Sequence, residues 1–295
     1  MEYISVLEAA KRWGLSERSV RNYCAQGRIP GALLTGKTWN IPETAEKPAR
    51  KPRRDAGKRD LLTVLREEKA TKLPGGIYHK VQIDLTFNSN HIEGSRLTHD
   101  QTRMIFETNT IGMDATVRVD DVVETANHFR CIDLIIDAAN HTVTESLIKQ
   151  LHAVLKNGTS DSRKDWFAVG DYKRFPNEVG GMFTAAPAEV PAAMKALLRD
   201  YNAKKIKTFD DLLDFHYNFE RIHPFQDGNG RVGRLLLFKE CLRNGIVPFI
   251  LTEDLKLYYY RGLQNWETEP GYLRDTCGLA QDRFKQVLEY FKVLY

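Results

Sequence analysis

The chain has 295 residues, of which 42% are hydrophobic and 28% are charged, the composition of a globular protein long enough for about two domains. No apolar run approaches the roughly 20 residues that span a bilayer, and the start has neither a basic segment nor an apolar signal segment. We therefore expect a cytoplasmic protein without membrane contact. The net charge of +4 excludes no class of partner, whereas the four scattered cysteines indicate neither a zinc site nor a disulfide framework.

Residues 1–42 have the pattern of a small separate module. A serine followed three residues later by a glutamate is a capping box that predicts a helix over 6–13, and a second serine predicts a helix over 16–23. Segment 32–41 predicts two short strands around a Gly36-Lys37 turn. The module resembles MerR-type and excisionase-type winged helix-turn-helix domains. That resemblance implies that the second helix meets the major groove of DNA through Arg18, Arg21 and Asn22.

Segment 43–60 is basic and is interrupted by Pro48 and Pro52. It has no apolar periodicity, which predicts a poorly ordered linker. One interpretation is DNA binding through residues 1–60, with the linker along the phosphate backbone. The other is a plain tether, with a module that binds protein or nothing.

From residue 61 to 295 the apolar residues recur at helical spacing, and this predicts an all-α core. Well-defined helices are expected over 78–90, 120–139, 145–155, 208–222, 231–240, 253–266 and 279–294. The exception is segment 169–184, where glycines flanked by β-formers predict a short β-hairpin.

Segment 223–234, His-Pro-Phe-Gln-Asp-Gly-Asn-Gly-Arg-Val-Gly-Arg, combines groups that suit phosphate chemistry. Gly228, Asn229 and Gly230 can adopt positive backbone dihedrals and form an anion-binding nest at a helix start. Two arginines three residues apart, Arg231 and Arg234, can each hold phosphate oxygens bidentately. The segment also contains the carboxylate of Asp227, which would need a bridging Mg²⁺ beside phosphate. Its imidazole, His223, can accept a proton.

The pattern His-x-Phe-x-Asp-Gly-Asn-Gly-Arg-x-x-Arg resembles the signature loop of the Fic family at each of its eight specified positions. The resemblance implies a Fic-type helical core that transfers AMP from ATP to a hydroxyl group of a target protein. In that interpretation His223 is the general base and Asp227 holds Mg²⁺ against the α- and β-phosphates. Gly228, Asn229 and Gly230 form the anion hole, and the two arginines of the loop hold the β- and γ-phosphates.

The hexapeptide Ser89-Asn-His-Ile-Glu-Gly94 is similar to the Ser/Thr-x-x-x-Glu-Gly/Asn inhibitory motif of Fic proteins. The resemblance implies that a helix over 78–94 brings Glu93 to Arg234, so that the γ-phosphate loses its partner and ATP binds misaligned. The plainer alternative is that Glu93 and Gly94 simply end a helix.

By the same resemblance the 169–184 hairpin is the flap on which a target protein docks and presents its Ser, Thr or Tyr hydroxyl. Tyr260 would stack on adenine or serve as ordinary packing. Three other functions stay open: a DNA-binding regulator whose core senses nucleotide, transfer from another nucleotide, and removal of AMP. The target protein, the nucleotide and any homo-oligomer are beyond the sequence.

Overall fold

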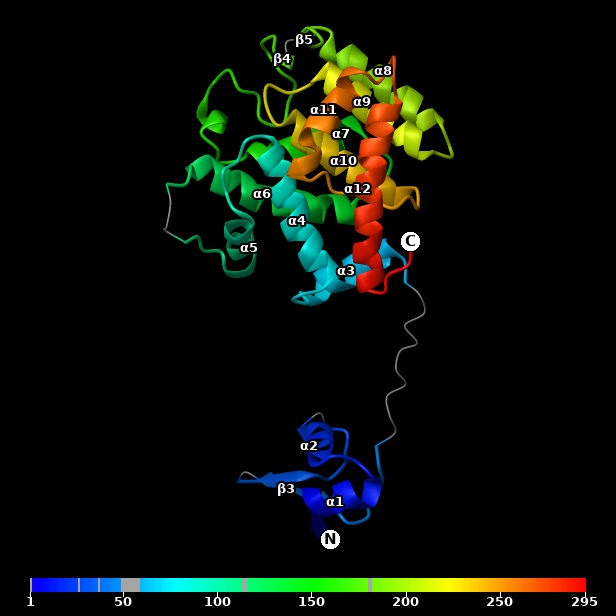
Figure 1. The fold of residues 1–295 in the computed structure, drawn as a ribbon. Helices are drawn as coiled ribbons and strands as arrows, with labels where there is room; N and C mark the ends of the chain where they lie inside the picture. Colours follow the sequence, from blue (N-terminus) through cyan, green and yellow to red (C-terminus); the bar gives the residue numbers. More distant parts are fainter. Residues whose placement is uncertain (1, 26, 37, 49–58, 113–115, 180–181) are drawn as a thin grey trace. The chain divides into compact units, whose positions relative to one another are not determined.

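The structure is a computed structural model that describes residues 2–25, 27–36, 38–48, 59–112, 116–179 and 182–295. The chain divides into two compact units, residues 1–57 and 58–295 (Figure 1). Among the described helices, none is long and apolar enough to cross a membrane.

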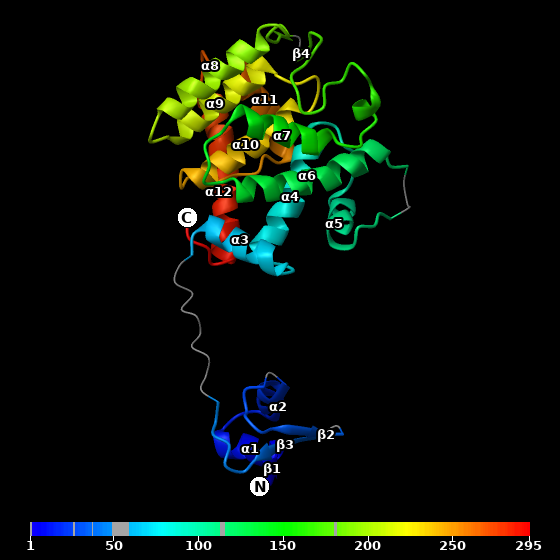
Figure 2. The ribbon, with the colours of Figure 1, turned by 180° about the vertical axis from the view of Figure 1, so that it is seen from behind.

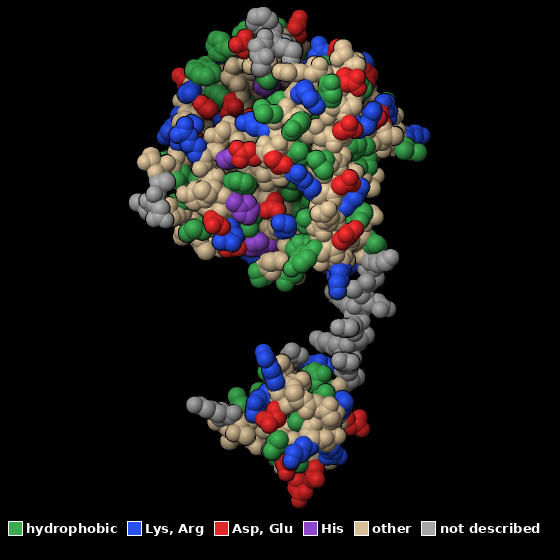
Figure 3. Space-filling view, viewed as in Figure 1, with side chains coloured by type: hydrophobic (Ala, Val, Ile, Leu, Met, Phe, Trp, Pro, Cys, Tyr) green, Lys and Arg blue, Asp and Glu red, His purple; other side chains and the backbone are tan. Residues whose placement is uncertain are grey.

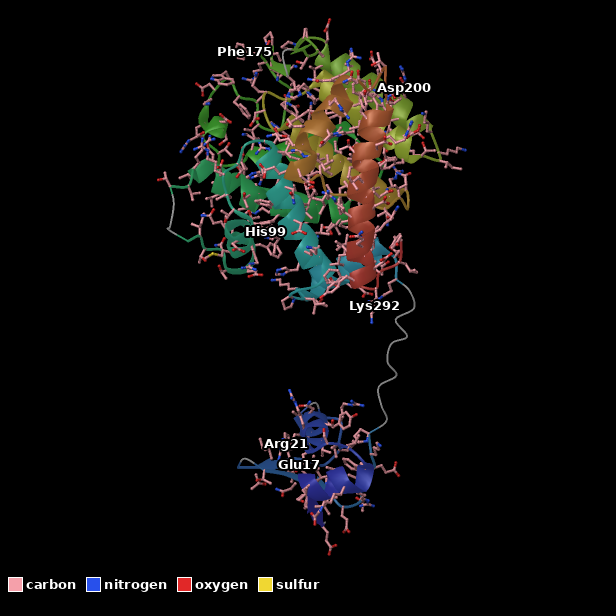
Figure 4. The ribbon with its side chains drawn as sticks, in the orientation of Figure 1. Glu17, Arg21, His99, Phe175, Asp200 and Lys292 are labelled. Carbon is pink, nitrogen blue, oxygen red and sulfur yellow. The ribbon has the colours of Figure 1, made fainter. Side chains whose placement is uncertain are left out.

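The smaller unit has two helices and a three-stranded antiparallel sheet of strand order β1-β3-β2. The first helix begins with the predicted capping box, in which Ser5 and Glu8 cap each other, and it ends at Gly14 in the left-handed conformation. Arg21 on the second helix pairs with Glu17, one turn earlier (Figure 4). The elements are β1 (Tyr3–Ser5), α1 (Val6–Trp13), α2 (Glu17–Ala25), β2 (Leu33–Thr35) and β3 (Thr38–Pro42). Lys37, in the predicted turn, lies outside the described residues.

The larger unit is helical, with one short antiparallel hairpin, β4 (Glu178–Val179) and β5 (Met182–Phe183). Single 3₁₀ turns lie at Asp161–Arg163 and Glu253–Leu255. The helices are α3 (Leu61–Thr71), α4 (Ile77–Ile92), α5 (His99–Thr108), α6 (Val119–Asp137), α7 (Glu145–Lys156), α8 (Val190–Ala203), α9 (Phe209–Ile222), α10 (Asn229–Arg243), α11 (Lys256–Gln264) and α12 (Gly271–Tyr290).

Helix α10 is the centre of the larger unit. It packs against α9, α6, α7 and α4, which surround it in both ribbon views (Figures 1 and 2). A helix that is hydrophobic on all faces is stable only when other helices or strands surround it. The apolar residues of α10 are accordingly almost completely buried: Val232, Leu235, Leu236, Leu237 and Phe238. The first turn of α10, which carries the two signature arginines, is therefore fixed by the core.

Helix α4 is held on its outer side by α5 and by the turn before α11. Three histidines make these contacts with carboxylates: His79 with Glu107, His99 with Asp84, and His91 with Glu253. Figure 3 shows histidine side chains on this face, among lysines and arginines that alternate with acids.

Three predicted boundaries were wrong. The last helix begins at Gly271 rather than at 279, because Pro270 stands at its N-cap and two glycines inside the helix obscure the apolar period. The predicted helix over 253–266 is a 3₁₀ turn followed by α11, which ends at Gln264. The paired strands of the hairpin cover only 178–179 and 182–183 of the predicted 169–184 segment.

Candidate active site

His223 lies where helix α9 ends. The helix begins at Thr208 with a capping box to Asp211, and His223 ends it with φ of 50°, the left-handed conformation that stops a helix. The imidazole Nδ1 lies 3.3 Å from the carbonyl oxygen of Glu220. Burial lowers the pKa of His223 to about 4, and the nearby charge of Lys173 acts in the same direction. The imidazole is therefore neutral at pH 7 and can accept a proton.

The loop after His223 is closed by Asn229. Its side chain is buried and makes two 2.8 Å hydrogen bonds with the backbone of Phe225: Oδ1 accepts from the N–H, and the amide Nδ2 donates to the carbonyl oxygen. Only Gly228 of the predicted nest has a positive φ, 82°, because Asn229 and Gly230 already belong to α10. The loop thus offers the N–H groups of a helix N-terminus to an anion, and the Asn229 side chain shapes the loop.

Asp227 is held by two cations of its own chain. Its Oδ2 accepts hydrogen bonds from Lys156 Nζ at 2.6 Å and from Arg231 Nη2 at 3.2 Å. Burial alone would raise the pKa of Asp227, but the charges of Arg231 and Lys156 hold it far below its usual range. Asp227 is therefore an anion, and 48% of its side chain remains exposed.

Lys156, the last residue of α7, joins three carboxylates although its side chain is only 2% exposed. Besides Asp227, its Nζ lies 2.5 Å from Glu124 Oε1 and 3.0 Å from Asp161 Oδ2. Glu124 also pairs with Arg231. Lys156 and Glu124 were not predicted from the sequence, because each has the spacing of an ordinary solvent-facing residue of an amphipathic helix.

Arg234 is 5% exposed and is engaged by the end of helix α4. Its Nη2 lies 2.7 Å from Glu93 Oε1 and 2.9 Å from the carbonyl oxygen of Ser89, and its Nε donates to Ser89 Oγ at 3.0 Å. A Cβ atom at Gly230 would meet Glu93 Oε1, so a larger residue there would displace the Glu93 carboxylate from its present position. The structure thus brings Ser89 and Glu93 of the 89–94 hexapeptide to the second signature arginine.

Tyr260 is partly buried in the cluster that contains Tyr259, and the two rings lie 5.4 Å apart. Burial raises the pKa of Tyr260 to about 12, and the charge of Glu93 adds to the effect. The neighbouring Tyr259 is fully buried and bonds His216 at 2.7 Å. Tyr260 therefore lies within electrostatic reach of the Glu93–Arg234 pair and is packed on one side.

A polar cavity of about 130 Å³ opens between the end of α4, helix α6 and the signature loop. Charged side chains from all three regions line it, so it suits an anion with a cation rather than an apolar ligand. Its lining includes Glu93, Glu124, Lys156, Asp227 and Arg231.

His152 packs against the signature loop, a role that was not predicted from the sequence. Its ring stacks on Phe225 with centroids 3.9 Å apart. Nδ1 accepts a hydrogen bond from the Gly170 N–H at 2.9 Å, and Nε2 lies 3.1 Å from the carbonyl oxygen of Asp227. Burial lowers the pKa of His152 to about 4, so the neutral ring carries its proton on Nε2 and donates it to that carbonyl.

Comparison with known proteins gives this geometry a family context. Residues 142–240 match the profile of the Fic/DOC family. The chain is 28% identical over 215 residues to Protein adenylyltransferase Fic of Drosophila erecta, which covers 70% of this chain and 41% of that protein. It therefore spans about two-fifths of the length of such curated relatives. The Drosophila melanogaster protein of the same name is 28% identical over 219 residues.

Solved structures show the same fold. A Fic domain containing signaling protein from Bacteroides thetaiotaomicron superposes with a TM-score of 0.59 at 26% identity, covering 78% of this chain and 91% of that one. Fic-1 from C. elegans gives a TM-score of 0.60 at 20% identity, over 77% of this chain and 69% of its own.

Proposed function

Because residues 142–240 match the Fic/DOC family, we propose that this chain is an auto-inhibited protein adenylyltransferase. It transfers AMP from ATP to a Ser, Thr or Tyr hydroxyl group of another protein and releases pyrophosphate. The observation that carries the proposal is the meeting of His223, Asp227 and Arg231 in one loop with Arg234, which Glu93 already occupies.

The chemical step needs one base. The target hydroxyl oxygen attacks the α-phosphorus, its proton passes to the neutral imidazole of His223, and the bond from the α-phosphorus to the bridging oxygen breaks. A new P–O bond forms as pyrophosphate leaves. The N–H groups at the start of α10 and the guanidinium of Arg231 would stabilise the phosphate charge.

Asp227 would hold the Mg²⁺ that such a reaction uses. A half-exposed carboxylate at a polar cavity is the oxygen donor that Mg²⁺ prefers. In the described part of the chain no group of three or more His, Cys, Asp or Glu is arranged to hold a metal alone, so phosphate oxygens and water would complete its coordination. When bound, the ion would neutralise phosphate charge. Lys156 and Arg231 both bond Oδ2 of Asp227, so Oδ1 is the oxygen that neither cation engages.

Auto-inhibition follows from the state of Arg234. A buried arginine that is already paired with a carboxylate gains little by exchanging it for phosphate. Glu93 thereby leaves the γ-phosphate without its cation, and the α-phosphate is not aligned for attack by the target hydroxyl.

The test compares wild type with Glu93→Gly, Glu93→Gly/His223→Ala and Glu253→Gly, using α-labelled ATP, Mg²⁺ and cell lysate. A charge-assisted hydrogen bond contributes about 1.5–3 kcal/mol, so Glu93→Gly should tighten ATP binding and raise transfer about 10- to 100-fold. Glu253→Gly removes an exposed carboxylate that pairs with His91 and should leave transfer near wild type.

Labelling that survives the added His223→Ala substitution would remove His223 as the base. Equal transfer by wild type and Glu93→Gly would refute auto-inhibition. Parallel reactions with GTP, CTP and UTP distinguish another donor nucleotide, and incubation with AMP-modified protein tests AMP removal.

A second function rests on the smaller unit. Arg18, Arg21 and Asn22 are exposed on α2, after the short connection from α1, and this arrangement supports a recognition helix for DNA. In this alternative the chain is a DNA-binding regulator whose core senses nucleotide. Binding of random duplex DNA that weakens with salt and is reduced in Arg18→Ala/Arg21→Ala would support it. No binding at low salt would exclude it.

A further inference from the structure

Lys173 has a setting that the proposed reaction does not explain. It lies in the segment before β4 and is 3% exposed. Its described partners are all neutral: the ammonium contacts an amide oxygen, a hydroxyl and a backbone carbonyl. Burial lowers the pKa of Lys173 to about 8, so it is still mostly charged at pH 7.

Burying an ammonium group away from any carboxylate is costly. Buried lysines that serve stability alone are normally paired, as Lys156 is with Asp227. Methionine or leucine would fill the same space without that cost. The charge at Lys173 therefore has a use that packing does not supply.

The three oxygen partners come from three places around His223. Asn177 Oδ1, at 2.6 Å, precedes β4, and Thr184 Oγ1, at 2.6 Å, follows β5. The carbonyl oxygen of Ile222, at 3.4 Å, belongs to the last turn of α9, directly before His223. The three hydrogens of one ammonium group thus reach both arms of the hairpin and the helix that delivers the base.

Further bonds join the same two segments. The Lys173 N–H donates to the Pro224 carbonyl at 2.9 Å, and the Asn177 side-chain amide donates to the Phe225 carbonyl at 3.0 Å. The N–H of Phe175, an exposed residue marked in Figure 4, donates to Gln226 Oε1 at 3.3 Å. The hairpin and the signature loop are therefore one hydrogen-bonded body, with the Lys173 ammonium at its centre.

We propose that Lys173 is a positioning residue: it fastens both arms of the β4–β5 hairpin to the C-terminal end of α9 and holds a positive charge beside His223. The proposal rests on the proposed function, in which the hairpin presents the target hydroxyl to His223. Lys173 then sets the distance between that edge and the base, and its charge favours the neutral imidazole.

Other titratable groups around His223 also act on its protonation. His223 is faced by the carboxyl group of Glu220 on α9, with Oε2 at 4.0 Å from Nδ1; burial raises the pKa of Glu220 to about 8, so this group is mostly neutral at pH 7. It is also faced by the charges of Glu93 at the end of α4 and Asp227 in the signature loop. Both Glu93 and Asp227 favour the protonated imidazole, and the charge of Lys173 opposes them. Removing Lys173 should therefore make His223 bind a proton at higher pH.

The experiment uses the full chain with Lys173→Met, which keeps most of the length of the side chain and removes the charge, and Thr184→Val, which removes one acceptor and leaves the charge. Lys195→Met, on the exposed side of α8, is the matched control. NMR titration of His223 and hydrogen exchange at the Lys173 and Thr184 amides are measured in the otherwise wild-type chain. Steady-state transfer to protein is measured in the Glu93→Gly background.

Lys173→Met should raise the titration midpoint of His223, speed exchange of both amides at least tenfold, and lower kcat/KM for the protein target about 10- to 100-fold at unchanged KM for ATP. Thr184→Val should speed exchange of the Thr184 amide and lower kcat/KM without moving the His223 midpoint. A purely structural role of Lys173 would leave that midpoint unchanged.

An unmoved midpoint together with unchanged amide exchange in Lys173→Met would overturn the proposal. If Lys173→Met does not fold, unchanged exchange and kcat/KM in Thr184→Val overturn the fastening role. Should Glu93→Gly transfer nothing, the proposed function fails, yet the titration and the exchange still decide the role of Lys173.

Discussion

Lys156→Met removes the one ammonium that three carboxylates share, while the methionine fills most of the space. Removing one partner of a buried ion pair costs about 3–5 kcal/mol of folding free energy. Each carboxylate keeps another cation, however: Glu124 and Asp227 keep Arg231, and Asp161 keeps Lys164. The three are also 13%, 48% and 26% exposed, so we expect a loss of about 2–3 kcal/mol at pH 7.

Lys149→Met is the matched control on the same helix. Lys149 also joins two carboxylates, Glu145 at 2.8 Å and Asp171 at 3.0 Å, but its side chain is 29% exposed. Exposed pairs contribute about 0–1 kcal/mol. Urea unfolding of both variants, followed by circular dichroism, measures the two losses, and equal m-values would show that the denatured states are alike.

The loss in Lys156→Met should also depend on pH. The cations hold the pKa of Asp227 and that of Asp161 below their ordinary values, although burial opposes this in both. Their stabilisation is present above the unfolded pKa of about 4 and is lost as pH falls through the folded pKa. The gap between variant and wild type should therefore shrink below about pH 4. A Lys156→Met loss no larger than that of Lys149→Met, or a gap that widens as pH falls below about 4, would refute the reasoning.

Two further predictions concern the packing between α9 and α10. Gly233→Ala should lower the free energy of unfolding by about 1–3 kcal/mol, because the new Cβ would collide with Glu220 Oε1 and lie 3.0 Å from the buried His216 ring. The control is Gly278→Ala in α12, where the space is open; it should stabilise the chain by up to about 1 kcal/mol. Equal shifts of the melting temperature in the two variants would contradict this prediction. Burial raises the pKa of Glu220 to about 8, so the folded chain keeps a proton that the unfolded chain releases above about pH 4.3, and stability falls as pH rises through that window. Glu220→Gln should remove this decline and gain about 3–4 kcal/mol more at pH 8 than at pH 5. The same gain at both pH values in thermal unfolding would contradict the buried proton.

Local features of the sequence predicted much of the fold. The predicted capping box at Ser5 is present because its bonds join residues three apart, whatever the rest of the chain does. The apolar run 235–238 is a buried helix, as predicted, because consecutive apolar side chains point to all sides of a helix and require burial on every side. The twelve residues of the signature loop placed the base, a carboxylate and two arginines together, since a short segment cannot separate them.

Only the tertiary structure decided which charges those residues meet. Arg231 and Glu124 are 107 positions apart, and Asp227 and Lys156 are 71 apart, so no local spacing joins them. Glu93 was linked to Arg234 by family resemblance alone, and Lys173 and Glu220 were not anticipated. The physical reason is that capping and helical periodicity are short-range, whereas burial and the pairing of charges arise when helices pack around α10.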